Sequence, residues 1–412
     1  MSLLTQASLV LTPTSYKANK LYSVVPSSGS GDMTTTRATT ATRVNSSGLV
    51  ENVATGIPRI DYTDGVANIL LEPQRTNLAA YSTQFNDAYW SKNNSTISAN
   101  LVTSPDGTTT ADKIVSNLFT GRIAVWKVFT VTVNVKNTFT IYAKAAEWNR
   151  ICIFHDATTF SEGNFYGSST VVNLLTGVSS NPSITKSTSV GNGWYRIETS
   201  ATPTITSHNI AIVPFAPSTT DVNAVVGDGV SGVYIWGAQM ETGSYATSYI
   251  PTTTSTVTRN TDIMTLNNIY TNNFITSVGG TWFVELNNNF SLTRDVGGQF
   301  GIGTTSEISF GSGLSIRRDN VTGRLSIIKY TSASGFGLYN TLTDNIKVAI
   351  KWNGATADVF VNGIKVVTST SFTTTEMQFI QGNTSDVPKY IKSFMLFPTP
   401  LTDAQCISLT TL

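Results

Sequence analysis

Short runs of alternating apolar and polar residues extend along most of the chain. Residues 129–135, 139–143 and 150–154 each alternate with a period of two, and clusters of Gly, Pro, Asn and Ser separate such runs. A period of two is typical of β-strands with one buried face, whereas an amphipathic helix repeats about every 3.6 residues. The pattern therefore predicts an all-β fold, with many short strands arranged as sandwiches or jelly rolls.

The segment at 232–241 predicts the closing strand of a domain. Val233 and Ile235 point to one face of this strand, and Tyr234 and Trp236 point to the other. Because both faces are apolar, the strand must be covered on both sides, as it would be inside a sandwich. A Thr-Gly-Ser turn and a Thr-rich tail follow, and neither has the apolar content of a core. We therefore expect a domain to end near residue 262.

The chain then divides into three predicted units. We expect an extended N-terminal segment at 1–75, a first jelly roll at 76–262 and a second jelly roll at 263–412. The N-terminal segment has strand candidates at 7–11 and 20–25 but few apolar residues. Ordering the backbone costs about 1 to 2 kcal/mol per residue, so we expect this segment to complete its core against another subunit or surface.

The unit at 263–412 contains the sharpest local signals. Three alternating runs at 346–352, 357–361 and 364–369 are joined by Asn-Gly pairs, which favour two-residue β-hairpin turns. Thr402 and Gln405 have the spacing of a helix capping box. The signals predict an antiparallel meander, followed near the C-terminus by a short helix.

The chain is poor in charge. Only 12% of its 412 residues are charged, and the net charge is +1, so no long-range field attracts nucleic acid or an anionic membrane. We expect neither nucleic-acid binding nor membrane insertion, since no run approaches the roughly 20 apolar residues of a spanning helix. The N-terminus also lacks the pattern of a signal peptide. Cys152 and Cys406 lack metal or redox spacing, so we expect buried free thiols, no metal and no cofactor.

Few residues offer acid–base or nucleophilic chemistry. His155 and His208 are the chain's two histidines, and neither lies near a Gly-x-Ser-x-Gly nucleophile. Glycoside cleavage requires two carboxylates on either side of the bond, yet Glu285 and Glu307 each stand alone in the sequence. We therefore expect no catalytic residues and no enzyme activity. The alternative is a polysaccharide depolymerase whose carboxylates come together from different strands.

Aromatic and amide side chains are better candidates for function than acids. Aromatic rings stack on the C–H faces of sugars, while Asn, Asp and Arg bind the hydroxyls. Trp90, Trp194 and Trp236 lie in strands where we expect them to be core residues. The candidates for glycan contact are Trp126, Trp148, Asn149, Arg150, His155 and Tyr166.

Three long blocks of the sequence are specific enough to compare with known families. They are Asp32-Met-Thr-Thr-Thr-Arg-Ala-Thr-Thr-Ala-Thr-Arg-Val-Asn45, Leu70-Leu-Glu-Pro-Gln-Arg-Thr-Asn-Leu78, and the strand at 232–241 with its Ala246-Thr-Ser-Tyr-Ile-Pro251 turn. These blocks resemble segments of bacteriophage virion fibre proteins, notably those of crAss-like phages that infect Bacteroidetes. The resemblance implies a homotrimer on the virion surface, made in the bacterial cytoplasm, with residues 1–75 attaching it to other capsid or tail proteins.

Further motifs resemble two kinds of sugar-binding domain. Pro105-Asp-Gly107 and Gly191-Asn-Gly-Trp-Tyr-Arg196, with the Trp236 strand, resemble the jelly-roll carbohydrate-binding modules of glycanases. The meander and the Leu401-Thr-Asp-Ala-Gln405 turn resemble concanavalin-A-like and laminin-G-like lectin domains. The resemblance implies a head-fibre or tail-fibre subunit that displays lectin-like domains to host surface glycans. A polysaccharide depolymerase and a capsid decoration protein without sugar binding stay open as alternatives.

Overall fold

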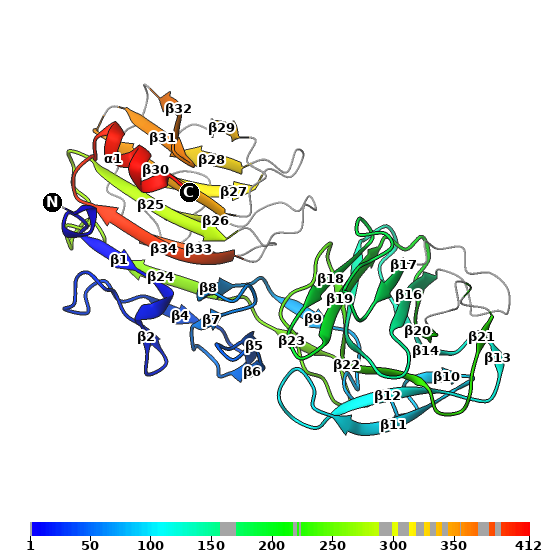
Figure 1. Cartoon of the computed structure of the whole chain (residues 1–412). Helices are drawn as coiled ribbons and strands as arrows, with labels where there is room; N and C mark the ends of the chain where they lie inside the picture. The colour runs from blue at the N-terminus through cyan, green and yellow to red at the C-terminus, as the bar shows by residue number, and fades with distance from the viewer. Residues whose placement is uncertain are drawn as a thin grey trace. The chain divides into compact units, whose positions relative to one another are not determined.

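The computed structural model describes residues 2–156, 170–216, 221, 224–287, 299–303, 313–318, 325–329, 335–339, 345–354, 356–369, 379–383 and 389–412. Within these ranges the chain is all-β, with antiparallel sheets and one short α-helix, which confirms the predicted fold class (Figure 1). The chain divides into two compact units. Unit 1 comprises Met1–Ser46, Asn52–Gln74 and Asn260–Leu412, and unit 2 comprises Ser47–Glu51 and Arg75–Arg259.

Unit 1 contains two large sheets that share one apolar core. In spatial order, the first sheet consists of β32 (Ile364–Ser369), β31 (Ala357–Val361), β30 (Asn345–Trp352), β25 (Gly280–Asn287), β34 (Lys389–Phe397), β8 (Asn68–Leu71) and β7 (Arg59–Asp61), with β1 (Leu9–Leu11) also paired to β34. The second consists of β29 (Gly335–Tyr339), β28 (Leu325–Lys329), β27 (Gly313–Arg318), β26 (Gln299–Gly303), β33 (Phe379–Asn383), β24 (Ile263–Asn267) and β4 (Thr34–Thr36). Val284 and Ile350 of the first sheet and Ile302 and Ile316 of the second belong to one buried cluster.

The predicted meander and helix are confirmed. β30, β31 and β32 pair in sequence order, and Asn362 and Gly363 of the last turn have φ angles of 47° and 82°, as an Asn-Gly hairpin requires. The helix α1 (Asp403–Thr410) begins with a capping box in which Thr402 Oγ1 accepts from the Gln405 N–H and the Gln405 side chain accepts from the Thr402 N–H. Its buried Cys406 packs in a cluster with Phe283 and Phe360.

The N-terminal residues do not form the separate segment that we expected at 1–75. β1 pairs with β34, β4 pairs with β24 and β8 pairs with β34, so these residues extend both sheets of unit 1. Their buried side chains Leu9, Ile60 and Leu71 enter the same core as Val284. The N-terminal segment has too few apolar residues for a core of its own, and strands from the C-terminal part of the same chain provide the rest of that core. The two units divide after residues 74 and 259.

Unit 2 also contains two large sheets. The five-stranded sheet has, in spatial order, β10 (Ser91–Asn93), β14 (Ala124–Thr130), β20 (Ser207–Phe215), β16 (Arg150–Asp156) and β17 (Thr170–Asn173). The six-stranded sheet has β11 (Ser95–Val102), β12 (Ala111–Ser116), β22 (Gly232–Thr242), β15 (Asn137–Ala145), β19 (Trp194–Ala201) and β18 (Thr185–Ser189).

The short elements of the chain are η1 (Leu3–Thr5), η2 (Pro13–Ser15), β2 (Tyr16–Lys17), β3 (Lys20–Leu21), β5 (Ala41–Val44), β6 (Val50–Val53), β9 (Arg75–Asn77), β13 (Thr120–Gly121), β21 (Val225–Val226) and β23 (Val257–Arg259).

The strand β22 is covered on both faces, as its sequence predicts. Val233 and Ile235 lie in the main core of unit 2, while Trp236 lies in a smaller cluster on the opposite face of the sheet. The chain after β22 folds back over that face, because the Ile250 N–H donates to Gln239 Oε1 at 2.6 Å. Tyr249 then packs on Trp236, with ring centroids 4.7 Å apart. The face is therefore closed by an aromatic layer along part of its length.

One predicted strand is wrong over most of its length. The alternating run at 129–135 is a strand only up to Thr130, where β14 ends. The following residues turn, and Asn134 has a φ of 63°. Asparagine tolerates this left-handed conformation better than most residues, so it ends a run whose apolar pattern alone predicts a longer strand.

Candidate functional site

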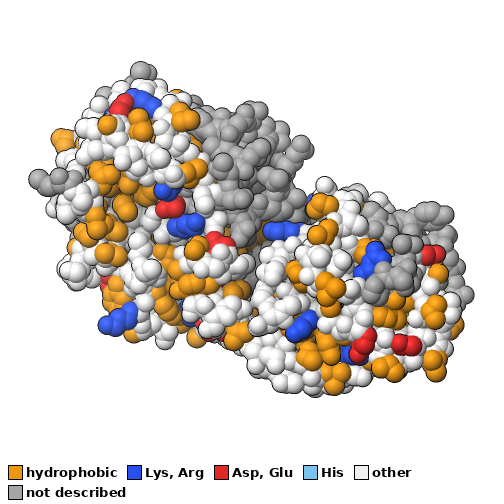
Figure 2. Space-filling view, viewed as in Figure 1, with side chains coloured by type: hydrophobic (Ala, Val, Ile, Leu, Met, Phe, Trp, Pro, Cys, Tyr) orange, Lys and Arg blue, Asp and Glu red, His pale blue; other side chains and the backbone are white. Residues whose placement is uncertain are grey.

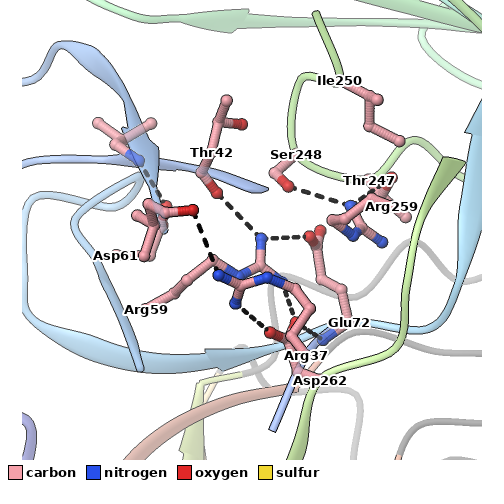
Figure 3. Close-up of polar contacts among 12 residues, drawn as sticks. Arg37, Thr42, Arg59, Asp61, Glu72, Thr247, Ser248, Ile250, Arg259 and Asp262 are labelled. Atoms are coloured by element: carbon pink, nitrogen blue, oxygen red, sulfur yellow. Dashed lines mark hydrogen bonds and ion pairs between the residues drawn. The ribbon is translucent and has the colours of Figure 1, made fainter. Parts of the chain in front are cut away.

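Unit 1 buries a cluster of four charged side chains (Figure 3). Arg37 follows β4, Arg59 lies on β7, Glu72 follows β8, and Asp262 precedes β24. Arg37 Nη1 donates to Asp262 Oδ1 at 2.8 Å, and Arg59 Nη1 donates to Glu72 Oε2 at 2.7 Å. Arg59 Nη2 also pairs with Asp262 Oδ2. The four side chains are at most 1% exposed, so two positive and two negative charges balance each other away from water.

The cluster has a structural role. Burial alone would lower the pKa of Arg59, but the charges of Asp262 and Glu72 raise it above its usual value. Arg37 donates further hydrogen bonds to the backbone carbonyls of Ala54 and Thr39. The two acids are therefore committed to arginines and do not form a carboxylate pair around an open site. Their contacts fasten the N-terminal strands of unit 1 to the start of β24.

The predicted glycan-binding residues of unit 2 do not share one surface. Trp148 is 5% exposed and packs in the main core of the unit, so its ring lies in the interior and not on a stacking surface. Trp126 on β14 lies opposite Ala211, which lies opposite Phe154 on β16. Side chains alternate along a strand, so Trp126 and Phe154 share a face and His155 points to the other.

Arg150 and Asn149 lie away from Trp126. Arg150 shares the face of Trp126 but lies at the start of β16, four residues before Phe154. Four residues of a strand span about 13 Å. Its guanidinium lies 5.1 Å from the centroid of Phe215. Asn149 precedes β16, and its backbone carbonyl accepts from the Leu174 N–H. Tyr166 lies outside the described residues.

His155 and His208 form a pair in the five-stranded sheet. His155 Nδ1 lies 2.8 Å from His208 Nε2, a hydrogen bond in which one ring donates to the other. Burial, with a smaller contribution from His208, lowers the pKa of His155 to about 3. His155 therefore stays neutral near pH 7. It offers a sugar no positive charge, and it has no nucleophile among its described hydrogen-bond partners.

A pocket of about 530 Å³ lies beside the six-stranded sheet of unit 2. Its walls come from residues 48–49, from 101–105 with Thr109, and from 190–192. Lys144 and Trp194 complete it. The volume falls within the range of about 300 to 1,000 Å³ that is typical of small-molecule sites. Sequence reasoning found none of these residues as ligand contacts.

Trp194 is the buried base of the pocket. It is 2% exposed, and its indole Nε1 donates to the Thr103 carbonyl at 3.0 Å. The prediction that Trp194 is a core residue is confirmed, although its cluster is the smaller one, with Tyr142 and Trp236. The hydrogen bond joins the base of the pocket to one of its walls and so fixes the wall's position.

The turn before β19 forms another wall. Gly191, Asn192 and Gly193 all have positive φ angles, of 85°, 52° and 77°. This backbone requires Gly or Asn at each position, which the Gly-Asn-Gly sequence supplies. The turn is closed by a hydrogen bond from the Trp194 N–H to the Gly191 carbonyl at 2.8 Å. It presents the exposed Asn192 side chain at the pocket.

Lys144 is the charged side chain of the pocket. It lies directly opposite Trp194 in the pairing of β15 with β19, and opposite Tyr234 in the pairing of β15 with β22. No Asp or Glu is among the described residues that line the pocket. The arrangement offers an ammonium group, an amide and hydroxyl groups beside apolar Leu101 and Val190, and its described lining contains no carboxylic acid.

Comparison with known proteins finds similarity among solved structures. No protein-family model matches it, and no curated protein matches it. Similar solved structures include domain 4 of an extracellular GH43 arabinanase from Geobacillus stearothermophilus, bound to arabinotriose, at 13% identity over 41% of this chain and 82% of that one, with a TM-score of 0.31. The binding domain of botulinum neurotoxin DC, in complex with rat synaptotagmin II, has 17% identity over 37% and 40%, and a TM-score of 0.28. The CBM40 domain of a Ruminococcus gnavus sialidase has 13% identity over 32% and 83%, and a TM-score of 0.25.

Those scores assign neither a fold family nor a ligand to this chain. In the part of the chain that the structure describes, no helix has the length and apolar character of a membrane crossing, since α1 has only eight residues. The described residues also contain no group of three or more His, Cys, Asp and Glu side chains that could hold a metal ion.

Proposed function

We propose that the protein is a non-enzymatic adhesion protein, a head-fibre or tail-fibre subunit of a bacteriophage virion that binds host surface glycans. The observation that carries the glycan-binding part of the proposal is the pocket of unit 2, and the virion part rests on the resemblance of the three sequence blocks to phage fibre proteins. The pocket combines apolar walls with an amide and an ammonium group, and none of its described lining residues is a carboxylic acid. Such a site holds a sugar by its apolar faces and hydroxyls but lacks the two carboxylates that glycoside cleavage requires.

The surface composition agrees with this role. The face drawn in Figure 2 carries scattered charged side chains among many uncharged ones, in keeping with a chain in which 12% of residues are charged. A surface of this kind favours hydrogen bonds and apolar contacts at close range over long-range attraction. Single sites of this kind bind weakly, and a homotrimer in many copies on a virion raises their avidity.

Glycan binding is tested on an array of bacterial surface polysaccharides with the purified full chain. We expect binding without release of reducing sugar.

Leu101→Gln tests whether the pocket is the binding site. Leu101 is 49% exposed in an apolar wall of the pocket, and its replacement by Gln should weaken binding about tenfold. Leu175→Gln, at an exposed leucine outside the pocket lining, is the matched control and should bind normally. Release of oligosaccharide would instead identify a depolymerase.

The virion assignment is tested separately. Electron microscopy of virions labelled with an antibody against this chain should place it on head or tail fibres, and mass measurement of the purified chain should give a trimer. Label that is absent from virions, on a chain that still binds glycans, would remove the phage role and leave the adhesion role.

A further inference from the structure

Lys144 is a pocket lysine that has no carboxylate partner among the described residues. No ion pair or hydrogen bond of its ammonium group occurs among the described residues, and its side chain passes within 3.4 Å of the position that a Cβ on Gly193 would take. The side chain therefore follows the 191–193 turn into the pocket wall. Trp194 and Tyr234 flank it on neighbouring strands, so aromatic rings replace part of the water around its stem.

A second lysine in the same row of the sheet shows the contrast. Lys113 on β12 lies opposite Tyr234, which lies opposite Lys144 on β15, so the two lysines point to the same face about 10 Å apart. Lys113 Nζ pairs with Glu147 at 2.6 Å and donates to the Val230 carbonyl at 2.9 Å. Glu147 of the same chain therefore neutralises Lys113. No described residue of the pocket lining neutralises Lys144.

An acid in the same turn as the pocket residues Ser104 and Pro105 is already committed. Asp106 lies in the turn between β11 and β12 but does not line the pocket. Its Oδ1 accepts hydrogen bonds from Ser104 Oγ at 2.6 Å and from the Thr108 N–H at 3.0 Å. Asn192, on the opposite wall, offers an amide that donates as well as accepts.

We infer that the pocket selects sugars that carry an anionic group, with Lys144 Nζ as the cationic contact and the Asn192 amide as a second donor. This inference rests on the proposed glycan binding and narrows its ligand class. Carboxylate and sulfate groups share the required chemistry, because both accept charge-assisted hydrogen bonds from an ammonium group. A neutral sugar would leave the charge of Lys144 without a partner in the pocket.

The experiment compares anionic and neutral glycans on the full chain. The array contains uronic-acid polysaccharides with their carboxyl-reduced forms, and sulfated polysaccharides with their unsulfated forms. The wild-type chain should prefer the anionic member of a pair, and its affinity should fall as salt is raised. Lys144→Gln should weaken binding of the anionic member about tenfold to a hundredfold and weaken binding of the neutral member much less. Lys144→Arg should retain most of the preference.

A matched variant controls for lost charge alone. Lys186→Gln removes a lysine on the exposed edge strand β18 of the same sheet, outside the pocket lining, and should change nothing. Equal thermal unfolding of the three variants excludes misfolding as the cause. Preference for uronates or for sulfates identifies which group the pocket takes. Equal binding of both members of every pair, or an unaltered Lys144→Gln variant, overturns the inference while glycan binding stands. Binding to no glycan at all overturns the proposed function as well.

Discussion

The buried charges of unit 1 and the pocket lysine of unit 2 show two opposite treatments of positive charge. Arg37 and Arg59 are at most 1% exposed and share two carboxylates, so their charges are balanced inside the fold. Lys144 lies at a pocket whose described lining contains no acid. A buried charge that is already paired has a structural role, because its partner occupies it and because loss of that partner would leave an uncompensated ion in the interior. An unbalanced charge at a pocket is available to a ligand.

The comparison predicts its largest effect at Asp262, which both arginines of unit 1 contact. Asp262→Ala leaves two buried guanidinium groups short of a carboxylate, so we expect the unfolding free energy to fall by about 3 to 5 kcal/mol. Chemical denaturation measures this change. Lys365→Gln, which breaks partly exposed pairs with Asp358 and Asp403, should cost less than about 1 kcal/mol. Equal losses in both variants would refute a structural role for the buried cluster.

His155 sharpens the comparison because it is enclosed and stays neutral. Its pKa is lowered from 6.5 to about 3 in the folded chain, so the unfolded chain binds more protons between these values. The contribution of His155 to stability is complete above pH 6.5 and is lost as the pH falls towards 3. Denaturation at pH 7 and pH 4 should show a smaller loss of stability in His155→Gln than in the wild type. An identical loss would contradict the neutral state of His155 in the folded chain.

The turn at the pocket provides a smaller effect. Asn192 has a φ of 52°, which alanine adopts at a cost of about 1 kcal/mol and glycine adopts freely. Asn192→Ala should lower the unfolding free energy by about that amount, and Asn192→Gly should lower it less while removing the same amide. Both variants should weaken binding of the anionic glycan by a similar factor although their losses of stability differ. The pair of variants therefore distinguishes an effect on binding from an effect on folding. If the alanine variant is as stable as the wild type, the turn does not depend on this backbone conformation.

The smallest expected effect on stability is at Lys144. Lys144→Met removes a charge that no described residue balances, so the unfolding free energy should change by less than about 0.5 kcal/mol. Thermal and chemical denaturation measure it. A loss comparable to that of Asp262→Ala would show that Lys144 is structural and would remove the contrast between the two regions.

The sequence predicted those features that depend on neighbouring residues. The Asn362-Gly363 hairpin and the Thr402–Gln405 capping box are set by interactions within a few residues, and both occur as predicted. The two faces of β22 follow from alternation, which is also local. The fold class follows from many such strands together.

Other features depend on pairings between distant residues. β4 pairs with β24 across more than two hundred residues, so the sequence alone suggested a separate N-terminal segment. Lys144 meets Trp194 only through the register of β15 with β19. Trp148 was predicted to be a ligand contact, but it is buried. Its burial depends on the strands that cover it, and no local sequence pattern reveals those strands. The Gly-Asn-Gly turn before Trp194 is the local signal that could have pointed to the pocket, because its backbone conformation places Asn192 there.

The most direct test is a crystal structure of the full chain with an anionic oligosaccharide selected on the array. We predict the sugar in the pocket of unit 2, with an oxygen of its anionic group within about 4 Å of Lys144 Nζ and its ring beside Leu101 and Val190. A sugar bound at another place, or one bound in the pocket with its anionic group directed into solvent, would contradict the account.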